Sequence, residues 1–301
     1  MSPASAVVLA REGSSYRILL DGQERVAILR GKARQGERAV AGDRVSLDPT
    51  TLDDEVVAIE GVEPRRSLLE RRSPEGRGTR PVAANVDQVV IVTAAADPAP
   101  VLQLIDRLLV VAEANDIPAM VIVNKTDLAS DEVVRRHLVA AGYPVVATAV
   151  PGELGIAELR ERLEGRESVL TGPSGAGKSS LLNTIEPGLG LRIGSISAKA
   201  RRGKHTTTTA TMVPIGGDGF VVDTPGFSEV GIWALEAGAL AEYFPEFAPL
   251  SGSCRFADCR HRHEPGCAVL QAVADGGMPG TRHDGYLAIL AELEGLPEAW
   301  E

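Results

Sequence analysis

The segment Gly172-Pro-Ser-Gly-Ala-Gly-Lys-Ser179 constrains the fold of this chain more than any other feature. It matches the pattern G-x-x-x-x-G-K-[ST], and it lies between the apolar run 168–170 and the start of a helix at 180–183. Glycines allow backbone N–H groups to surround phosphate oxygens, and a helix N-terminus adds positive partial charge. A chance glycine-rich turn is the alternative, but the flanking strand and helix favour a nucleotide site.

The residues of this loop have separate predicted roles. Lys178 is expected to reach the β- and γ-phosphates and to act in catalysis, and the Ser179 hydroxyl to take one Mg²⁺ position. The loop alone does not distinguish ATP from GTP. The predicted nucleotide contacts are Gly172, Pro173, Ser174, Gly175, Ala176, Gly177, Lys178, Ser179 and Ser180.

Residues 85–230 alternate apolar strands with amphipathic helices, as expected for a mostly parallel sheet covered on both faces. Predicted strands lie at 89–92, 119–123, 144–147 and 168–170, and predicted helices at 101–114, 131–141 and 156–163. The phosphate loop follows the last of these strands. The pattern therefore predicts a central α/β domain that contains the nucleotide site.

A second motif, Asn124-Lys-Thr-Asp127, follows the strand that ends at residue 123. The Asp127 carboxylate can accept both hydrogens that guanine presents, whereas adenine offers no such pair, so this residue would select GTP. Asn124 would brace the loop, the Lys125 stem would cover a ring face, and the backbone of Thr148-Ala149 would donate to the guanine oxygen. The alternative is an ordinary strand-to-helix turn.

Two further segments are expected to sense the γ-phosphate. Asp223 follows a short apolar strand and would hold Mg²⁺ through water, and the Gly226 N–H would meet the γ-phosphate. Within Thr206–Thr209, Thr207 is expected to complete the Mg²⁺ shell, although a threonine run also suits a strand.

The residue after Gly226 bears on catalysis. Many GTPases place a glutamine there to orient water, but this chain has Phe227. His205 is the nearest polar candidate by sequence, either as a catalytic group or as a solvated loop histidine.

The order of these motifs is permuted. Asn124 precedes Gly172 by 48 residues, whereas GTPases ordinarily place the phosphate loop first. The same sheet forms if the cut falls at a surface connection. The segment Asp223–Gly226 then leads directly into the C-terminal segment, and we hypothesise that the two are coupled.

The N-terminal region, residues 1–65, contains five short apolar or alternating runs separated by turn signals. This pattern fits an OB-type β-barrel and an unspecialised β-domain about equally well. We predict the barrel and expect it to bind RNA. Residues 66–84 are predicted to be an exposed, Arg-rich linker.

All three cysteines lie within fourteen residues, as Cys254-x4-Cys259-x-His261-x5-Cys267. Three thiolates and one imidazole suit tetrahedral zinc, and four protein ligands indicate a structural ion. Free cysteines are the alternative, and His263 is a competing imidazole. Residues 231–301 are therefore predicted to be a mostly helical zinc-binding domain.

Charge limits the class of partner. The net charge of −10 argues against a polycation, but residues 192–205 hold five basic residues and no acid, and residues 63–80 hold six arginines and three glutamates. Such local basic stretches suit RNA contact. Because the sequence shows neither a bilayer-length apolar run nor a secretory signal, we expect a cytoplasmic protein without membrane contact.

Taken together, these motifs and their order resemble the family of ribosome small-subunit-dependent GTPase A. The resemblance rests on the permuted motifs, Lys204-His-Thr-Thr-Thr208, Asp223-Thr-Pro-Gly-Phe227 and the Cys/His cluster. It implies an OB barrel, a GTPase domain and a zinc domain. It also implies ribosomal RNA contact and GTP hydrolysis stimulated by the small ribosomal subunit late in its maturation.

Three functions remain open at this stage. The resemblance favours a small-subunit assembly factor that hydrolyses GTP to GDP. We expect it to use Mg²⁺ with the nucleotide, to hold one structural zinc ion and to be a monomer. The alternatives are a permuted GTPase acting on another RNA and a zinc RNA-binding module whose nucleotide site only holds shape.

Overall fold

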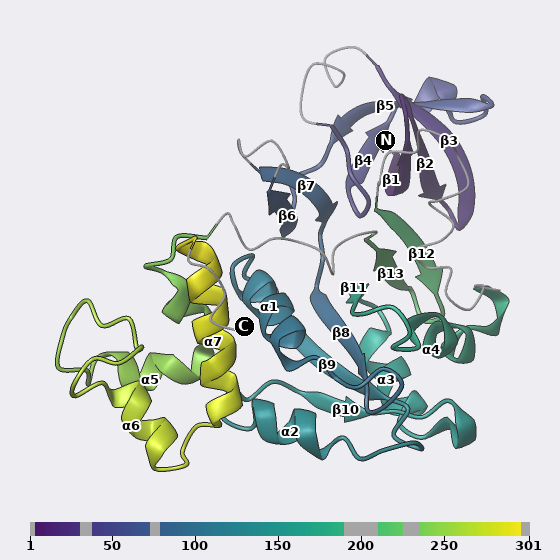
Figure 1. The fold of residues 1–301 in the computed structure, drawn as a ribbon. Helices are drawn as coiled ribbons and strands as arrows, with labels where there is room; N and C mark the ends of the chain where they lie inside the picture. The colour runs from purple at the N-terminus through teal and green to yellow at the C-terminus, as the bar shows by residue number, and fades with distance from the viewer. Residues whose placement is uncertain (1–3, 31–37, 73–78, 190–209, 225–234, 296–301) are drawn as a thin grey trace.

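A computed structural model describes residues 4–30, 38–72, 79–189, 210–224 and 235–295. Three regions follow one another in space as they do in sequence: an N-terminal barrel, a central α/β domain and a C-terminal helical region (Figure 1). The predictions for His205, Thr207, Gly226 and the basic segment 192–205 lie outside the described residues.

The central domain is built on six strands in the spatial order β10-β9-β8-β11-β13-β12. All neighbouring strands are parallel except the β12–β13 pair, as the alternation of strands and helices predicts. The bounds are β8 Gln88–Ala94, β9 Ala119–Asn124, β10 Val145–Ala147, β11 Glu167–Thr171, β12 Thr211–Ile215 and β13 Gly219–Asp223.

Helices cover both faces of this sheet. Because side chains alternate along a strand, Val89 and Ile91 of β8 join one apolar core, and Val90 and Val92 join the other. The first core includes α1 and α2, and the second includes α3 and α4. The helices are α1 Leu102–Glu113, α2 Glu132–Leu138, α3 Ile156–Leu163 and α4 Lys178–Ile185, with short 3-10 helices η3 Pro151–Glu153 and η4 Pro187–Leu189.

The N-terminal barrel confirms the expected five strands. They run in the order β1-β2-β3-β5-β4, and β4 pairs back onto β1 to close the barrel around its own apolar core. The barrel also joins the central sheet, because Ala10 of β1 pairs with Thr211 of β12. The bounds are β1 Ala4–Glu12, β2 Ser15–Leu20, β3 Gln23–Leu29, β4 Arg44–Leu47 and β5 Val56–Val62, with η2 at Pro49–Thr51.

The segment predicted to be an exposed linker is not one. Residues 66–84 contain an antiparallel pair, β6 Leu68–Arg72 and β7 Thr79–Ala84, in which Leu69 and Ala83 are fully buried. The prediction was wrong because it relied on the density of charge. Few apolar residues are enough to hold this strand pair against its neighbours, because backbone contacts also attach it. Ala83 forms a β-bridge with Ala41 of the barrel, and the Glu70 N–H donates to the Asn115 side chain at 3.1 Å.

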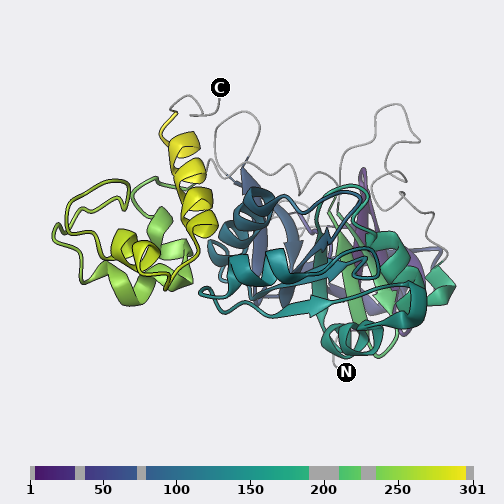
Figure 2. The ribbon, with the colours of Figure 1, turned by 60° about the horizontal axis from the view of Figure 1, so that its bottom comes forward.

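The C-terminal region is mostly helical, as predicted, and α7 lies against α1 in both views (Figures 1 and 2). Its core is aromatic: the ring centroids of Phe244 and Tyr286 are 5.2 Å apart, and those of Phe247 and Tyr286 are 4.9 Å apart. The elements are η7 Leu240–Tyr243, η8 Pro245–Phe247, α5 Ala248–Ser251, α6 Ala268–Ala274 and α7 Gly280–Leu293. Among the described residues, no helix has the length and apolar character needed to cross a bilayer.

A buried charged network joins this region to the central domain. Arg282 of α7 donates one hydrogen bond to Asp106 of α1 and one to Glu246 of η8, and both donor–acceptor distances are 2.5 Å. All three side chains are almost completely buried. His137 of α2 contacts the same Asp106 oxygen at 2.7 Å. Gly285 allows this close approach, because a Cβ atom there would lie 1.8 Å from Asp106 Oδ2.

Candidate nucleotide and metal sites

The phosphate loop runs from the end of β11 into α4, and two of its glycines face neighbours that leave no room for a side chain. A Cβ atom on Gly172 would lie 2.0 Å from the Val92 carbonyl oxygen, and one on Gly177 would lie 2.2 Å from Asn124 Nδ2. Both glycines have positive φ, at 133° and 94°. The local fold therefore requires glycine at these positions for steric and conformational reasons.

Lys178 is the first residue of α4, and its side chain folds back over the loop. Its Nζ donates to the carbonyl oxygens of Gly172 at 2.7 Å and Pro173 at 2.9 Å. Burial lowers the pKa of Lys178, and the nearby Asp223 carboxylate opposes that shift. The ammonium thus lies inside the loop, close enough to Asp223 to feel its charge.

Asp223 ends β13, the strand next to β11, so its carboxylate meets the phosphate loop at the carboxyl edge of the sheet. Burial raises the pKa of Asp223 to about 7, although Lys178 acts to lower it. Ser179 is buried near the same edge. A hydroxyl and a carboxylate are hard oxygen donors of the kind that Mg²⁺ binds, so these two residues fit the predicted magnesium positions.

Asn124 links the two nucleotide motifs. Its Nδ2 donates to the Ala176 carbonyl oxygen in the phosphate loop at 2.9 Å, and its Oδ1 accepts from the Thr148 hydroxyl at 3.1 Å. Asn124 therefore connects the ends of β9, β10 and β11. The structure brings together segments that lie 48 residues apart in sequence.

The other residues of this motif lie in two environments. Lys125 has φ 61°, an uncommon left-handed conformation for a residue with a side chain, and its Nζ donates to the Asp97 carbonyl oxygen. Asp127 is exposed. The Thr148 N–H donates to the Val123 oxygen at 2.9 Å, and the Ala149 N–H to the Leu154 oxygen at 3.0 Å. If either N–H group donates to guanine, it must share its hydrogen between the guanine oxygen and its present acceptor, or give up that acceptor.

One part of the site was absent from the sequence prediction. The loop after β8 reaches both nucleotide motifs, because Asp97 accepts from Lys125 and a Cβ atom on Gly175 would lie 3.3 Å from Pro98 Cδ. The signal was available: β8 ends at the same carboxyl edge as β9 and β11, and loops at that edge of a parallel sheet form ligand sites.

The metal cluster is compact. One ligand atom from each of Cys254, Cys259, His261 and Cys267 lies within 4.8 Å of every other. The His261 Nδ1 atom is 3.4 Å from the Cys267 Sγ and 3.7 Å from the Cys254 Sγ. Ligands about 2.3 Å from a tetrahedral zinc are about 3.8 Å apart, so the donor set and its size fit this ion. The competing His263 is exposed and is not part of the cluster.

Helix α7 and the turn at residues 260–264 hold His261 in place beside the thiols. The His261 backbone has φ 56°, and its carbonyl oxygen accepts a hydrogen bond from His283 Nε2 at 2.7 Å. Glu264 accepts from three backbone N–H groups of the same turn, those of Arg260, Arg262 and His263, and these bonds hold its pKa at about 2 against the effect of burial. These hydrogen bonds join groups of the protein itself, and they hold the turn in a conformation that places His261 beside the thiols.

Comparison with known proteins decides the family. The family model "RsgA GTPase" matches residues 62–233. The chain belongs to the RsgA GTPase family. It is 44% identical to the small ribosomal subunit biogenesis GTPase RsgA of Gemmatimonas aurantiaca, over 97% of this chain and 98% of that protein. It is 42% identical to the protein of the same name from Moorella thermoacetica, over 95% of this chain and 96% of that one.

Solved structures agree with the fold. The crystal structure of YjeQ from Thermotoga maritima superposes with a TM-score of 0.79 at 35% identity and covers 98% of this chain and 99% of that one. YloQ, described as a circularly permuted GTPase, gives a TM-score of 0.74 at 27% identity, over 99% and 97%. The predicted permutation, barrel and helical C-terminal region are thus confirmed, and the chain is a GTP-hydrolysing enzyme of the RsgA family.

Proposed function

We propose that this RsgA-family protein hydrolyses GTP while it assists late maturation of the small ribosomal subunit. The observation that supports the nucleotide part is the hydrogen bond from Asn124 to Ala176, which joins the segment proposed to recognise guanine to the glycine-rich loop proposed to bind phosphate. The printed names of its relatives support the ribosomal part. Hydrolysis by this site is phosphoryl transfer to water, in which the protein supplies positioning and charge neutralisation.

Each residue of the site has a proposed task. Asp127 accepts the two guanine hydrogens, Lys178 neutralises charge on the β- and γ-phosphates, and Ser179 and Asp223 hold Mg²⁺, which supplies further charge neutralisation when bound. Thr207 and Gly226 would complete the γ-phosphate contacts. We propose His205 as the group that orients water. If replacement of His205 by Ala left turnover unchanged with and without subunits, this role would be excluded.

The cysteine cluster is proposed to hold one structural zinc ion. Its four protein ligands leave no position for a substrate. Removal of the ion with a chelator is expected to unfold residues around 254–267 and to loosen α7, which contacts that turn through His283. Hydrogen exchange is the measurement, and unchanged protection of α7 in zinc-free protein would contradict the proposal.

The proposed partner is the small ribosomal subunit, contacted through its RNA by a monomer in the cytoplasm. The basic segments 63–80 and 192–205 support RNA contact, since each adds local positive charge to an acidic chain. A second candidate, a GTPase acting on another RNA, has no observation in its favour beyond this same charge.

Co-sedimentation tests this proposal directly. Purified small subunits are mixed with the chain and either GDP or a non-hydrolysable GTP analogue, with large subunits as the control. The proposal expects retention on small subunits that is stronger with the analogue, and loss of that difference in Lys178→Ala, which lacks the phosphate contact. Equal retention on both subunits, or equal retention with both nucleotides, would contradict it.

A further inference from the structure

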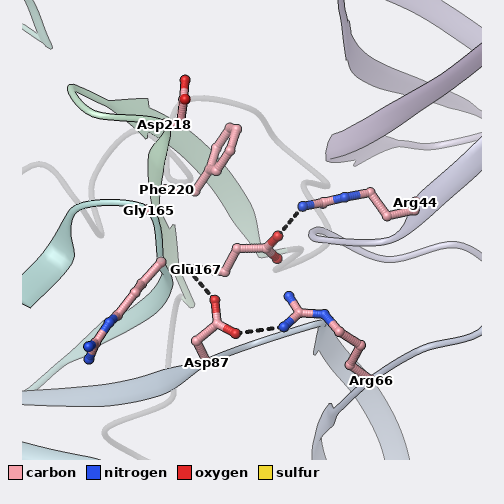
Figure 3. A pocket seen from close by; sticks show the side chains of 8 residues that line it. Arg44, Arg66, Asp87, Gly165, Glu167, Asp218 and Phe220 are labelled. Atoms are coloured by element: carbon pink, nitrogen blue, oxygen red, sulfur yellow. Dashed lines mark hydrogen bonds and ion pairs between the residues drawn. The ribbon is translucent and has the colours of Figure 1, made fainter.

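A pocket of about 330 Å³ lies where the barrel meets the central domain (Figure 3). It is at the amino-terminal edge of the parallel sheet, opposite the nucleotide site, because Asp87, Glu167 and Asp218 lie at or just before the starts of β8, β11 and β13. Charged side chains dominate it, and the lining residues are Arg44, Arg66, Asp87, Gly165, Arg166, Glu167, Asp218 and Phe220.

Glu167 is the central residue of this pocket. It is the first residue of β11, and its carboxylate is paired with Arg44 of barrel strand β4. The Glu167 N–H donates to Asp87 Oδ2 at 2.8 Å, and Arg66 donates to the other Asp87 oxygen at 2.9 Å. Figure 3 shows this chain of contacts passing from the barrel, through β11, to the segment before β8.

The Arg44–Glu167 pair is poorly suited to stabilising the fold. The Glu167 side chain is only 5% exposed, and its Oε2 has no hydrogen-bond partner among the described residues. Burial raises the pKa of Glu167 despite the attraction of Arg44. A buried carboxylate with one unsatisfied oxygen often contributes less stability than an apolar residue of similar size, so stability alone does not account for a glutamate here.

The position of Glu167 suggests another role. All of β11 is buried between β8 and β13, and the strand leads directly to Gly172 of the phosphate loop. Five residues of strand span roughly 17 Å. A displacement of the barrel that moves Glu167 therefore has a direct, tightly packed route to the phosphate loop.

The barrel contacts the central domain at neighbouring points as well. The Gly42 carbonyl oxygen accepts from Asn85 Nδ2 at 2.8 Å, and a Cβ atom on Gly42 would lie 2.1 Å from the Ala84 oxygen. On the other side, Ala10 pairs with Thr211 at the start of β12. Because these contacts lie beside Arg44, a change in the orientation of the barrel would also change the geometry of the Arg44–Glu167 pair.

We propose that Glu167 is a positioning residue through which the barrel sets the geometry of the phosphate loop, so that ribosomal RNA bound by the barrel accelerates GTP hydrolysis. This inference rests on the proposed function, since it requires stimulation by the small subunit. Glu167 contacts neither nucleotide motif directly. It acts through β11.

The test compares Glu167→Gln and Arg44→Gln with the unmodified chain. Basal GTP turnover, affinity for a GTP analogue and turnover with saturating small subunits are measured for each. Both variants are expected to keep basal turnover and analogue affinity and to lose about fivefold or more of the stimulation. Because both remove the same contact, the double variant is expected to be no worse than either single variant.

Arg17→Gln is the matched control. Arg17 also lies in the barrel, its side chain is 34% exposed like that of Arg44, and it pairs with Glu24 within the barrel. The Arg17→Gln substitution therefore removes the same charge as Arg44→Gln but leaves the junction with β11 intact. Stimulation of this variant by small subunits is expected to stay at the level of the unmodified chain.

The outcomes separate two failures. An unmodified chain that small subunits do not stimulate would overturn both the proposed function and this inference. Normal stimulation of the unmodified chain that persists in Glu167→Gln would overturn the inference alone. Equal loss of stimulation in Arg17→Gln would also overturn it, because charge toward RNA, rather than the position of β11, would then explain the effect.

Discussion

The two junctions of the central domain use charged residues in opposite ways. Where α7 meets α1, Arg282, Asp106 and Glu246 are almost completely buried, and the guanidinium lies 4.3 Å from the centroid of the Phe244 ring. Where the barrel meets β11, the Arg44 side chain is 34% exposed and borders a pocket of about 330 Å³. The first junction is desolvated and bounded by aromatic rings, and the second is open to water on one side.

This difference indicates what each junction can do. Breaking a buried ion pair leaves an uncompensated charge in a medium of low dielectric constant, so the C-terminal junction resists opening. At the barrel junction only the Arg44 side chain is partly solvated, so its guanidinium can exchange the carboxylate for water while Glu167 stays buried. We therefore expect the barrel junction to change its geometry more readily than the C-terminal junction, which holds the helical C-terminal region against α1 and α2.

Replacement of Arg282 by Met gives the largest expected effect. The substitution keeps apolar volume but leaves Asp106 and Glu246 buried without their counter-charge, so the free energy of unfolding should fall by about 3–5 kcal/mol. Urea denaturation measures the loss, and hydrogen exchange should show that α7 is the helix that opens.

Arg107→Gln is the control for this change, because Arg107 also joins α1 to α7, through Glu292, in a partly exposed pair. Its expected cost is about 1 kcal/mol or less. Equal costs for the two substitutions would mean that the buried network does not distinguish the C-terminal junction.

Gly285→Ala tests the close packing of the same junction. The added Cβ would lie 1.8 Å from Asp106 Oδ2, so α7 must shift away from α1, at an expected cost of about 1–3 kcal/mol. Gly280→Ala on the same helix is the matched control, since the nearest atom to its Cβ would be 4.0 Å away. Thermal melting of both variants is the measurement, and a Gly285→Ala protein as stable as Gly280→Ala would exclude this packing.

Glu167→Gln should have the smallest effect on stability, and its sign should depend on pH. Because burial raises the pKa of Glu167 in the folded chain above its ordinary value of 4.5, the folded chain holds this proton more tightly than the unfolded chain. The free energy of unfolding contributed by Glu167 therefore falls as pH rises from 4.5 through the raised pKa. At pH 7.5 the variant should be as stable as the unmodified chain or more stable, by about 0–1 kcal/mol.

Urea midpoints at pH 5 and pH 7.5 measure this effect. The unmodified chain should lose stability relative to Glu167→Gln between the two values. A variant that is clearly less stable at pH 7.5 would show that the ionised pair stabilises the barrel junction, and the contrast between the two junctions would then disappear.

Sequence alone predicts the local parts of this molecule. The phosphate loop, Asn124–Asp127 and the Cys/His cluster are each continuous or nearly so, and each requires particular residue types at fixed spacing. The alternation of strands and helices predicted the parallel sheet for the same reason. These features depend on residues that are close to one another along the chain, so the sequence pattern is enough to predict them.

The junctions could not be predicted in this way. Arg282 and Asp106 are 176 residues apart, and Arg44 and Glu167 are 123 apart. A lone charged residue gives no sign that it will be buried, since its partner is set by the tertiary fold. The β6–β7 pair was missed for a related reason. Leu69 and Ala83 are buried in a core that also contains Ala41 of the barrel turn and residues of α1, and the arginines around them suggested an exposed linker.

Turnover of GTP by the unmodified chain tests the central claim most directly. The rate is measured alone, with purified small ribosomal subunits and with large subunits, at one salt concentration because RNA contact depends on ionic strength. The proposed function predicts slow turnover alone, a large increase with small subunits and no increase with large ones. Equal rates in all three conditions, or equal stimulation by both subunits, would contradict it.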